Sequence, residues 1–266
     1  MRRLRLISRK EGREQHSMLL LEGTHLLQEA LRTDYFPKEI VATTFWLNKH
    51  NEILEYISEK TQIIEVTKSV LEAALTTVTP DGVAALFPID ELPSLPKNAN
   101  FVLALDRVQD PGNMGNLFRT ALAADIECIW LASGAHPLSQ KVIRSSVGAV
   151  LHMPFERFGS TEQQSLELLE KRLKLFAEKG FQVIGSSSQK KQFVDPMIPY
   201  WEIDWGKPTV LVLGNEGSGL DADIQNCCTK LITLPHSSNV ESLNVAAAAV
   251  PLLLERRRAK MITGMQ

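Results

Sequence analysis

From Asn100 to the C-terminus, short apolar runs alternate with helical patterns, and this alternation limits the fold more than any other feature. The apolar runs expected to be strands are Phe101–Arg107, Glu127–Ala132, Gln182–Gly185, Thr209–Leu213 and Lys230–Leu234. The helical patterns are Asn116–Ala124, Ser139–Val147, Glu162–Lys179 and Leu243–Arg258. Such alternation predicts an α/β fold in which helices cover both faces of a parallel sheet. Ligands of such sheets bind beyond the carboxyl ends of the strands, so the loops after the strands are the first candidates for a site.

Residues 1–95 are predicted to form a separate, smaller α/β domain, and residues 96–266 the larger one. A strand that begins at Ser17 turns at Gly23 into an amphipathic helix. Later strands are expected at Glu39–Ala42, Thr61–Val66 and Val83–Phe87, with a helix over Asn51–Lys60. The stretch Leu92–Asn100, rich in Pro and Asn, is the expected linker.

The first residues of the chain are strongly basic. The cationic side chains before the first expected strand are Arg2, Arg3, Arg5, Arg9, Lys10 and Arg13. This segment is interpreted either as a solvated, frayed terminus or as an arm that contacts RNA.

Composition excludes several classes of protein. The formal net charge of −2 provides no global basic field, so any RNA site must be local. The three cysteines, Cys128, Cys227 and Cys228, form no CxxC pair and no disulfide framework, which suits a reducing cytosol and argues against structural zinc. The longest apolar run, Val245–Leu254, is about half the length of a membrane span. We therefore expect a cytoplasmic protein with neither a membrane nor a metal as partner.

The loop expected after the first strand of the larger domain contains two glycines within Asp110–Gly115. Asn113 lies in this loop. The helix after the loop buries one face and carries Arg119 on another, one turn from its start. Taken alone, this segment is better explained by a turn residue and a surface charge than by a site.

A second loop follows Thr209–Leu213 and has glycines at 214, 217 and 219, which allow the backbone to approach a ligand closely. The glycine order is not that of a Rossmann loop, and no Walker lysine follows. Glu216 would repel a phosphate. It would suit a cationic ligand, an amine, or a hydrogen bond that holds the loop, unless it is simply a solvated residue on a turn.

A third loop follows Leu234 and leads into a helix rich in alanine. Ser242 is the expected N-cap of this helix. Asn244, so early in the helix, can turn its amide back towards the loop. Ordinary capping would explain Ser242 fully and Asn244 in part.

Together and in this order, the three segments resemble the motifs of the SpoU family of RNA ribose methyltransferases, part of the knotted SPOUT class. The segments that carry the resemblance are Asn113–Ala121, Leu213–Leu220 and Leu234–Val245, and Ser145–Ala149 with Pro154 is similar to the segment between motifs. The resemblance covers about residues 100–258. It implies a deep trefoil knot in the larger domain and a homodimer whose active site takes residues from both subunits.

The resemblance also implies a reaction, in which S-adenosylmethionine is the cofactor and the ribose 2′-hydroxyl of an RNA is methylated. The residues that it places at the cofactor are Leu213, Gly214, Asn215, Gly219, Leu234 and Leu243. Those that it places around the reacting groups are Arg119, Asn113, Glu216, Ser242 and Asn244. A guanidinium holds its proton above about pH 12, so Arg119 is predicted to bind the neighbouring phosphate and stabilise the alkoxide while the phosphate or a water takes the proton.

The chain departs from the family pattern at three positions. His236 and Ser238 stand where methionine and glycine are usual, and Pro251 interrupts the expected last helix, where it should kink or shift the helix.

The N-terminal unit, with Leu21–Gly23 and Thr79–Gly82, is similar to the ribosomal-protein-like RNA-binding domain often fused to this catalytic domain. It favours large-subunit ribosomal RNA over transfer RNA as substrate. Two other functions stay open: a non-catalytic RNA-binding or ribosome-assembly factor that keeps the fold, and a knotted enzyme that methylates a base nitrogen. The presence of Arg119, Glu216 and Asn244 favours catalysis, and the pair of Asn113 and Arg119 favours ribose.

Overall fold

The computed structural model describes residues 2–57, 59–187, 197–262 and 264, and the chain divides into two compact units. Unit 1 comprises Met1–Pro93 and Pro137–His152, and unit 2 comprises Ser94–His136 and Met153–Gln266. The segment Pro137–His152, which the sequence pattern places in the larger domain, is thus part of the first unit. Over the described ranges, no helix is long and apolar enough to cross a membrane, and no group of three or more His, Cys, Asp or Glu could hold a metal ion.

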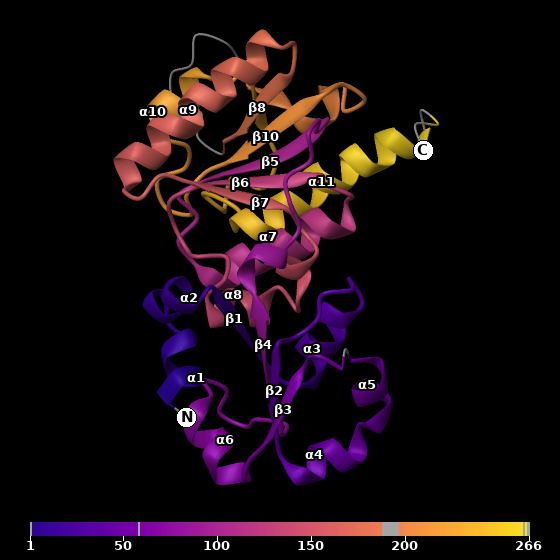
Figure 1. The fold of residues 1–266 in the computed structure, drawn as a ribbon. Helices are drawn as coiled ribbons and strands as arrows, with labels where there is room; N and C mark the ends of the chain where they lie inside the picture. Colours follow the sequence, from indigo (N-terminus) through magenta and orange to yellow (C-terminus); the bar gives the residue numbers. More distant parts are fainter. Residues whose placement is uncertain (1, 58, 188–196, 263, 265–266) are drawn as a thin grey trace. The chain divides into compact units, whose positions relative to one another are not determined.

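Unit 1 contains a four-stranded sheet in the order β1-β4-β2-β3 (Figure 1). Its strands are β1 (Met18–Glu22), β2 (Glu39–Ala42), β3 (Gln62–Glu65) and β4 (Val83–Pro88). β4 runs antiparallel to both of its neighbours, and β2 and β3 are parallel. The helices are α1 (Arg2–Ile7), α2 (Lys10–His16), α3 (Thr24–Leu31), α4 (Thr44–Lys49), α5 (Asn51–Tyr56), α6 (Lys68–Ala74) and α8 (Gln140–Ser145), with 3-10 turns η1 (Ile89–Glu91) and η2 (Ala149–Leu151). α5 lies in the range predicted as a helix, Asn51–Lys60, of which residue 58 lies outside the described residues.

The basic N-terminal segment is folded, so the prediction of a frayed terminus is wrong. Leu4 and Ile7 of α1 are buried in a cluster with Leu20 of β1. Arg13 of α2 is also buried, and its Nη1 donates to the carbonyl of Ser8 at 3.0 Å. α1 folds because Leu4 and Ile7, three residues apart, give this short helix one apolar face for the core, while the arginines of α1 stay exposed to water.

Unit 2 contains a seven-stranded sheet in the order β7-β6-β5-β10-β8-β11-β9. Its strands are β5 (Phe101–Asp106), β6 (Cys128–Ala132), β7 (Phe155–Phe158), β8 (Gln182–Ser186), β9 (Ile198–Pro199), β10 (Thr209–Leu213) and β11 (Lys230–Thr233). Every pairing is parallel, which confirms the predicted class of sheet. The pattern missed β7 and β9. Both are edge strands, and β9 has only two residues, so neither carries a continuous apolar run.

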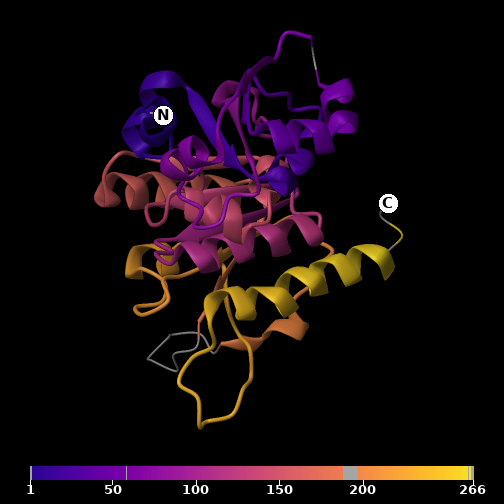
Figure 2. The same ribbon diagram turned by 90° about the horizontal axis from the view of Figure 1, so that it is seen from below.

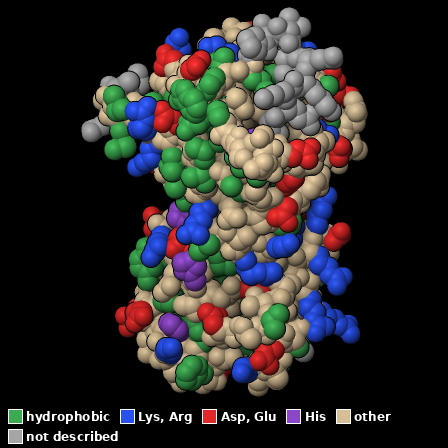
Figure 3. Space-filling view, turned by 180° about the vertical axis from the view of Figure 1, so that it is seen from behind, with side chains coloured by type: hydrophobic (Ala, Val, Ile, Leu, Met, Phe, Trp, Pro, Cys, Tyr) green, Lys and Arg blue, Asp and Glu red, His purple; other side chains and the backbone are tan. Residues whose placement is uncertain are grey.

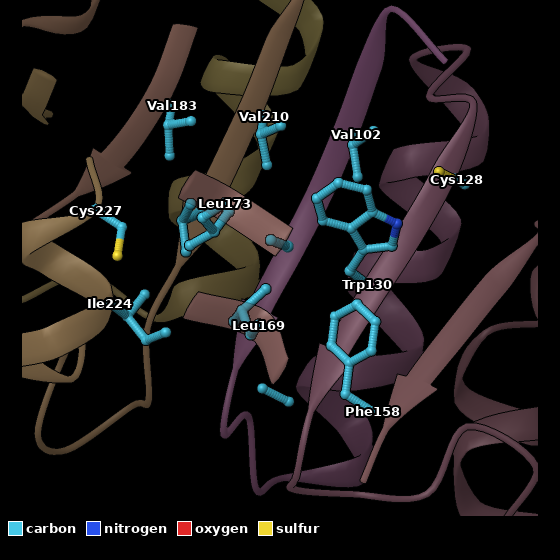
Figure 4. Close-up of a cluster of buried hydrophobic side chains, with 13 residues drawn as sticks. Val102, Cys128, Trp130, Phe158, Leu169, Leu173, Val183, Val210, Ile224 and Cys227 are labelled. Atoms are coloured by element: carbon cyan, nitrogen blue, oxygen red, sulfur yellow. The ribbon is translucent and has the colours of Figure 1, made fainter. Parts of the chain in front are cut away.

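Helices cover both faces of this sheet, in three layers (Figure 2). α9 (Glu162–Glu178) and α10 (Ala222–Asn226) lie on one face, and α7 (Pro111–Ala123) and α11 (Val245–Ile262) pack together on the other. Figure 4 shows Leu169 and Leu173 of α9 against Trp130, Val183 and Val210 of the sheet. The connection between β9 and β10 includes the 3-10 turn η3 (Tyr200–Glu202).

α7 begins at Pro111, so the residues predicted to be a glycine loop form its first turn. The carboxylate of Asp110 accepts a hydrogen bond from the amide of Asn113 at 2.8 Å, and proline occupies the first helical position. Both features are strong signals for a helix start, and they outweigh the two glycines. Arg119 therefore lies roughly two turns from the start of the helix, not one.

α11 begins at Val245, two residues later than the predicted start at Leu243. Asn244, not Ser242, caps the helix, since its Oδ1 accepts from the amides of Ala246 at 2.9 Å and Ala247 at 3.1 Å. Pro251 lies inside α11, and the kink or shift expected at this residue stays a prediction. α11 continues through Pro251 to Ile262, although the proline offers no amide to the carbonyl one turn earlier.

The strand order brings distant parts of the chain side by side. β5 and β10 are neighbours, with Leu105 opposite Leu213. β6 and β7 lie beyond β5 on one side of this pair, and β8, β11 and β9 lie beyond β10 on the other side. The connections therefore diverge at the carboxyl ends of β5 and β10, where open α/β sheets bind their ligands.

Candidate functional site

Three loops meet at the carboxyl edge of the unit 2 sheet, and one side chain from each forms a continuous chain of hydrogen bonds. Asn244 Nδ2 donates to Asn113 Oδ1 at 2.9 Å, and Asn113 Nδ2 donates to Glu216 Oε1 at 3.0 Å. The three residues follow β11, β5 and β10. The structure therefore brings together three of the five residues that the family resemblance places around the reacting groups.

The carboxylate of Glu216 also holds the segment between β5 and α7. Its two oxygens accept hydrogen bonds from the backbone amides of Gln109 and Asp110, each at 3.1 Å. Partial burial by itself raises the pKa of the Glu216 carboxyl. The hydrogen bonds from Asn113 and from backbone amides outweigh burial, and the pKa is lowered. Glu216 is thus an anion at neutral pH that joins two motif loops.

The loop after β10 is closed on itself by Asn215. The backbone amide and carbonyl of Asn215 exchange hydrogen bonds with those of Gly219, both at 3.0 Å, and its Oδ1 accepts from the amide of Gly217 at 2.9 Å. Its Nδ2 donates to the carbonyl of Arg107 at 2.9 Å. A Cβ on Gly214 would lie 2.3 Å from the carbonyl carbon of Gly219, so only glycine fits there.

A buried carboxylate at the end of β5 supports the loops that follow β5 and β10. Asp106, at the end of β5, is fully buried and accepts from Arg107 Nε at 2.7 Å and from the amide of Asp221 at 2.6 Å. The hydrogen bond to Asp106 raises the pKa of the Arg107 guanidinium, which stays charged. Arg107 has a left-handed backbone (φ 56°). Asp106 therefore fixes both the exit from β5 and the end of the glycine loop.

The site predictions did not include Asp106, although a signal was present. It is the one charged residue in β5, at the end of an otherwise apolar strand. A charge there is rarely buried without a partner.

A cavity of about 310 Å³ lies between the glycine loop and the loop before α11. All six residues that the resemblance places at the cofactor line it: Leu213, Gly214, Asn215, Gly219, Leu234 and Leu243. Its charged lining residues are Glu216 and Glu241, and no lysine or arginine lines it among the residues that the structure describes. Partly apolar walls and two carboxylates suit an uncharged or cationic organic ligand and disfavour a phosphate.

The other predicted residues lie at different distances from the cavity. Ser242 lines it, whereas Asn113 and Asn244 stand beside it in the hydrogen-bond chain. Arg119 is exposed on α7 and is not part of the lining. The lining also contains Ser186 and Ser187, which were not predicted. They follow a predicted strand next to β10, so the strand order, once known, would have indicated them.

Comparison with known proteins shows the family of this chain. Residues 100–253 match the model of the SpoU rRNA Methylase family, and residues 1–85 match the MRM3-like substrate binding domain. The chain belongs to the SpoU rRNA methylase family. The SpoU match spans all three motif loops, so the site described above is the one that the family model covers.

Relatives of this SpoU family chain extend over nearly its whole length. A protein named as an uncharacterized tRNA/rRNA methyltransferase of Synechocystis sp. is 38% identical over 260 residues, 97% of this chain and 90% of that protein. A 23S rRNA (guanosine(2553)-2′-O)-methyltransferase of Bacillus subtilis is 32% identical over 93% of this chain and 92% of its own. The crystal structure of an AdoMet-bound rRNA methyltransferase from Sinorhizobium meliloti aligns with a TM-score of 0.79 and 26% identity, over 97% of this chain and 93% of that one.

Proposed function

We propose that this chain is an S-adenosylmethionine-dependent RNA methyltransferase that transfers a methyl group to a ribose 2′-hydroxyl. One observation carries the proposal: the cavity that the motif loops enclose has two carboxylates and, among the described residues, no lysine or arginine. S-adenosylmethionine carries its methyl group on a positively charged sulfur. A site with this charge favours such a donor over the phosphates of a nucleotide cofactor.

The residues of the cavity fit this cofactor. Leu213, Leu234 and Leu243 provide apolar contacts, and Gly214 lets two backbone segments approach closely. Glu216 contributes negative charge, which the hydrogen bonds to its carboxylate maintain at neutral pH. When bound, the cofactor supplies an activated methyl group. The chain then has to bind the RNA, align the ribose and manage one proton.

Arg119 is proposed to bind the RNA phosphate beside the target ribose and to stabilise the 2′-oxygen as it loses its proton. It is exposed and forms no ion pair with any residue that the structure describes, so its charge is available to a phosphate. The side-chain amide of Asn113 donates one hydrogen to Glu216 and accepts one hydrogen bond from Asn244. The remaining donor and acceptor of its amide can orient the ribose, and the phosphate or a water takes the proton.

We also propose a homodimer in which the second subunit completes the site, in a domain with the trefoil knot of the SPOUT class. Arg119 does not line the cavity within one chain, so a shared site would explain its place. α11 packs on α7 and yet exposes the large apolar side chains Val250, Leu254, Met261 and Ile262. Hydrophobic side chains gather on the face of unit 2 that Figure 3 shows. A second copy would cover them.

Ribosomal RNA of the large subunit is the proposed substrate, ahead of transfer RNA. Its support is the match of residues 1–85 to a substrate-binding domain and the 23S rRNA specificity named for the Bacillus subtilis relative. The exposed cations of α1, α2 and the turn between them include Arg2, Arg9 and Lys10, and Figure 3 shows Lys and Arg gathered on one side of unit 1. A basic face of this kind attracts RNA. We propose a cytoplasmic location, which the three free thiols support.

The test is methyl transfer to unmodified large-subunit rRNA transcripts by purified protein, with nucleoside mass spectrometry of the product. We expect 2′-O-methylated nucleosides. Arg119→Ala should lower the rate more than about tenfold, or 1.4 kcal/mol of barrier, whereas Lys174→Ala on α9, across the sheet from α7, should stay within about twofold. A methylated base would support the base-nitrogen enzyme. No calorimetric heat with the cofactor would support the non-catalytic RNA-binding protein.

A further inference from the structure

Unit 1 contains a cavity of its own, of about 300 Å³, at the side of α3 and α8. It is lined only by residues of that unit. Apolar contacts come from Leu26, Leu75, Pro80 and Val147, and the polar lining includes the Arg144 guanidinium. The residues are far apart in the chain and none belongs to the cofactor cavity. The volume is at the lower end of the range for small-molecule pockets, which begins at about 300 Å³.

One wall of this cavity is a loop, residues 75–81, that carboxylates hold at both ends: the buried Glu22 at one end and the exposed Asp81 at the other. The almost fully buried Glu22 accepts hydrogen bonds from the amide of Thr76 at 2.9 Å and the amide of Thr77 at 2.8 Å, and from both threonine hydroxyls. At the other end, Asp81 accepts from the amide of Thr24 at 2.8 Å. Between them, Val78 is 94% exposed. The loop is held in place by the buried carboxylate of Glu22, which is costly to bury, although the side chain at its tip, Val78, does not pack in the core.

Next to this loop, the lining combines a cation with a strained residue. Arg144 Nη1 donates to Thr76 Oγ1 at 2.8 Å and lies 3.6 Å from Glu22, while the side chain stays 39% exposed. Val147 has a φ of 53°, which is an outlier for a β-branched residue. Its side chain lines the cavity and is 36% exposed. Strain of this kind persists where the surrounding structure imposes it, and it gathers at ligand sites.

We propose that this cavity holds an unpaired nucleobase of the RNA substrate, with Arg144 facing the phosphate next to it. The inference rests on the proposed function, because that function makes RNA the ligand of unit 1. The apolar residues of the lining suit the face of a base, and a held guanidinium suits a backbone phosphate. Proteins read RNA mainly through bases that are splayed out of a loop or bulge. A cavity of about 300 Å³ with this lining can receive such a base.

The first experiment fills the cavity and compares a matched neighbour. Thr79 is exposed, lines the cavity and makes no hydrogen bond or ion pair with another described residue. Thr79→Trp should therefore block the cavity without loss of a contact, and Val78→Trp adds the same bulk outside it. In filter binding of an unmodified large-subunit rRNA transcript, Thr79→Trp should raise the Kd by about tenfold or more and Val78→Trp by less than about twofold. Cofactor affinity and the rate at saturating RNA should not change in either variant.

Two further measurements cover the case in which Thr79→Trp misfolds. In wild-type protein, a transcript containing 4-thiouridine should crosslink under ultraviolet light to peptides that contain residues 75–81 or 144–147. Arg144→Gln should flatten the dependence of log Kd on log salt concentration by about one phosphate contact. Crosslinks that map only to other parts of the chain, or an unchanged salt slope, would overturn the inference.

The outcomes also separate this inference from the proposed function. If the wild-type protein methylates the transcript and Thr79→Trp binds RNA like Val78→Trp, the cavity is not the base site and the methyltransferase assignment stands. If the wild-type protein methylates no RNA, the proposed function fails. A selective loss of RNA binding in Thr79→Trp would still support the cavity.

Discussion

Replacement of Glu216 by glutamine tests whether one carboxylate both joins the motif loops and attracts the cofactor. Glu216 accepts three hydrogen bonds, from Asn113 Nδ2 and from the amides of Gln109 and Asp110, at 3.0–3.1 Å. A glutamine amide presents one oxygen and one NH₂ group, so at least one of these donors would face another donor. Loss of one charge-assisted hydrogen bond costs about 2 kcal/mol. In a unit of this size that lowers Tm by about 4–8 °C.

Scanning calorimetry and titration with S-adenosylmethionine measure the two effects separately. Glu241→Gln is the matched control, because Glu241 also lines the cavity but makes no hydrogen bond to another described residue. We expect both variants to weaken cofactor binding and only Glu216→Gln to lose stability. A Glu216→Gln protein within about 0.5 kcal/mol of wild type at pH 7 would refute the joining role.

The same substitution predicts a pH dependence. The pKa of Glu216 is lowered in the folded protein, so its stabilisation is complete above the ordinary carboxyl value of 4.5 and is lost as the pH falls through the lowered value. The stability difference between wild type and Glu216→Gln should therefore be constant from pH 7 to about 5 and shrink below that. A difference that grows on acidification would contradict this assignment.

Two other substitutions test the support of the loops. Asp106→Asn should lower the free energy of unfolding by about 3 kcal/mol in urea denaturation, because it leaves the Arg107 guanidinium without its buried partner. The control is Glu170→Gln in a surface ion pair, which should cost less than about 1 kcal/mol. Equal costs would exclude a special role for Asp106. Asn244→Ala should destabilise unit 2 by about 1 kcal/mol or more through loss of the helix cap, and Ser242→Ala by less than about 0.5 kcal/mol; the reverse order in thermal melts would restore Ser242 as the cap.

Much of unit 2 could be predicted because its inner strands are unbroken apolar runs. β10 is entirely buried and its predicted bounds, Thr209–Leu213, match the structure. Besides the two short edge strands, the starts of α7 and α11 were predicted wrongly. Asp110 and Pro111 signal a start as strongly as the following glycines signal a loop, and only packing decides between them. At α11, Ser242 and Asn244 are both good caps, and the cap is the residue whose amide also reaches Asn113.

The candidate site was predictable in its residues but not in its connections. The motif glycines and polar side chains are visible in the sequence, whereas the hydrogen bonds among them depend on β5 and β10 being neighbours. The buried Asp106 and the role of Glu22 in unit 1 lay in segments where a single carboxylate at a strand end has no period to mark it. A charge at the end of an apolar strand marks such a residue as a candidate, but the donors that pair it follow only from the fold.

The hydrogen bond between Asn244 and Asn113 joins positions that are 131 residues apart. Contacts over such separations close late in folding, since the loop entropy must be paid before they contribute. S-adenosylmethionine, if all three loops hold it, therefore has no complete binding site on a partly folded chain. Its binding would slow unfolding of the finished protein and raise its melting temperature by mass action, without making the chain fold faster.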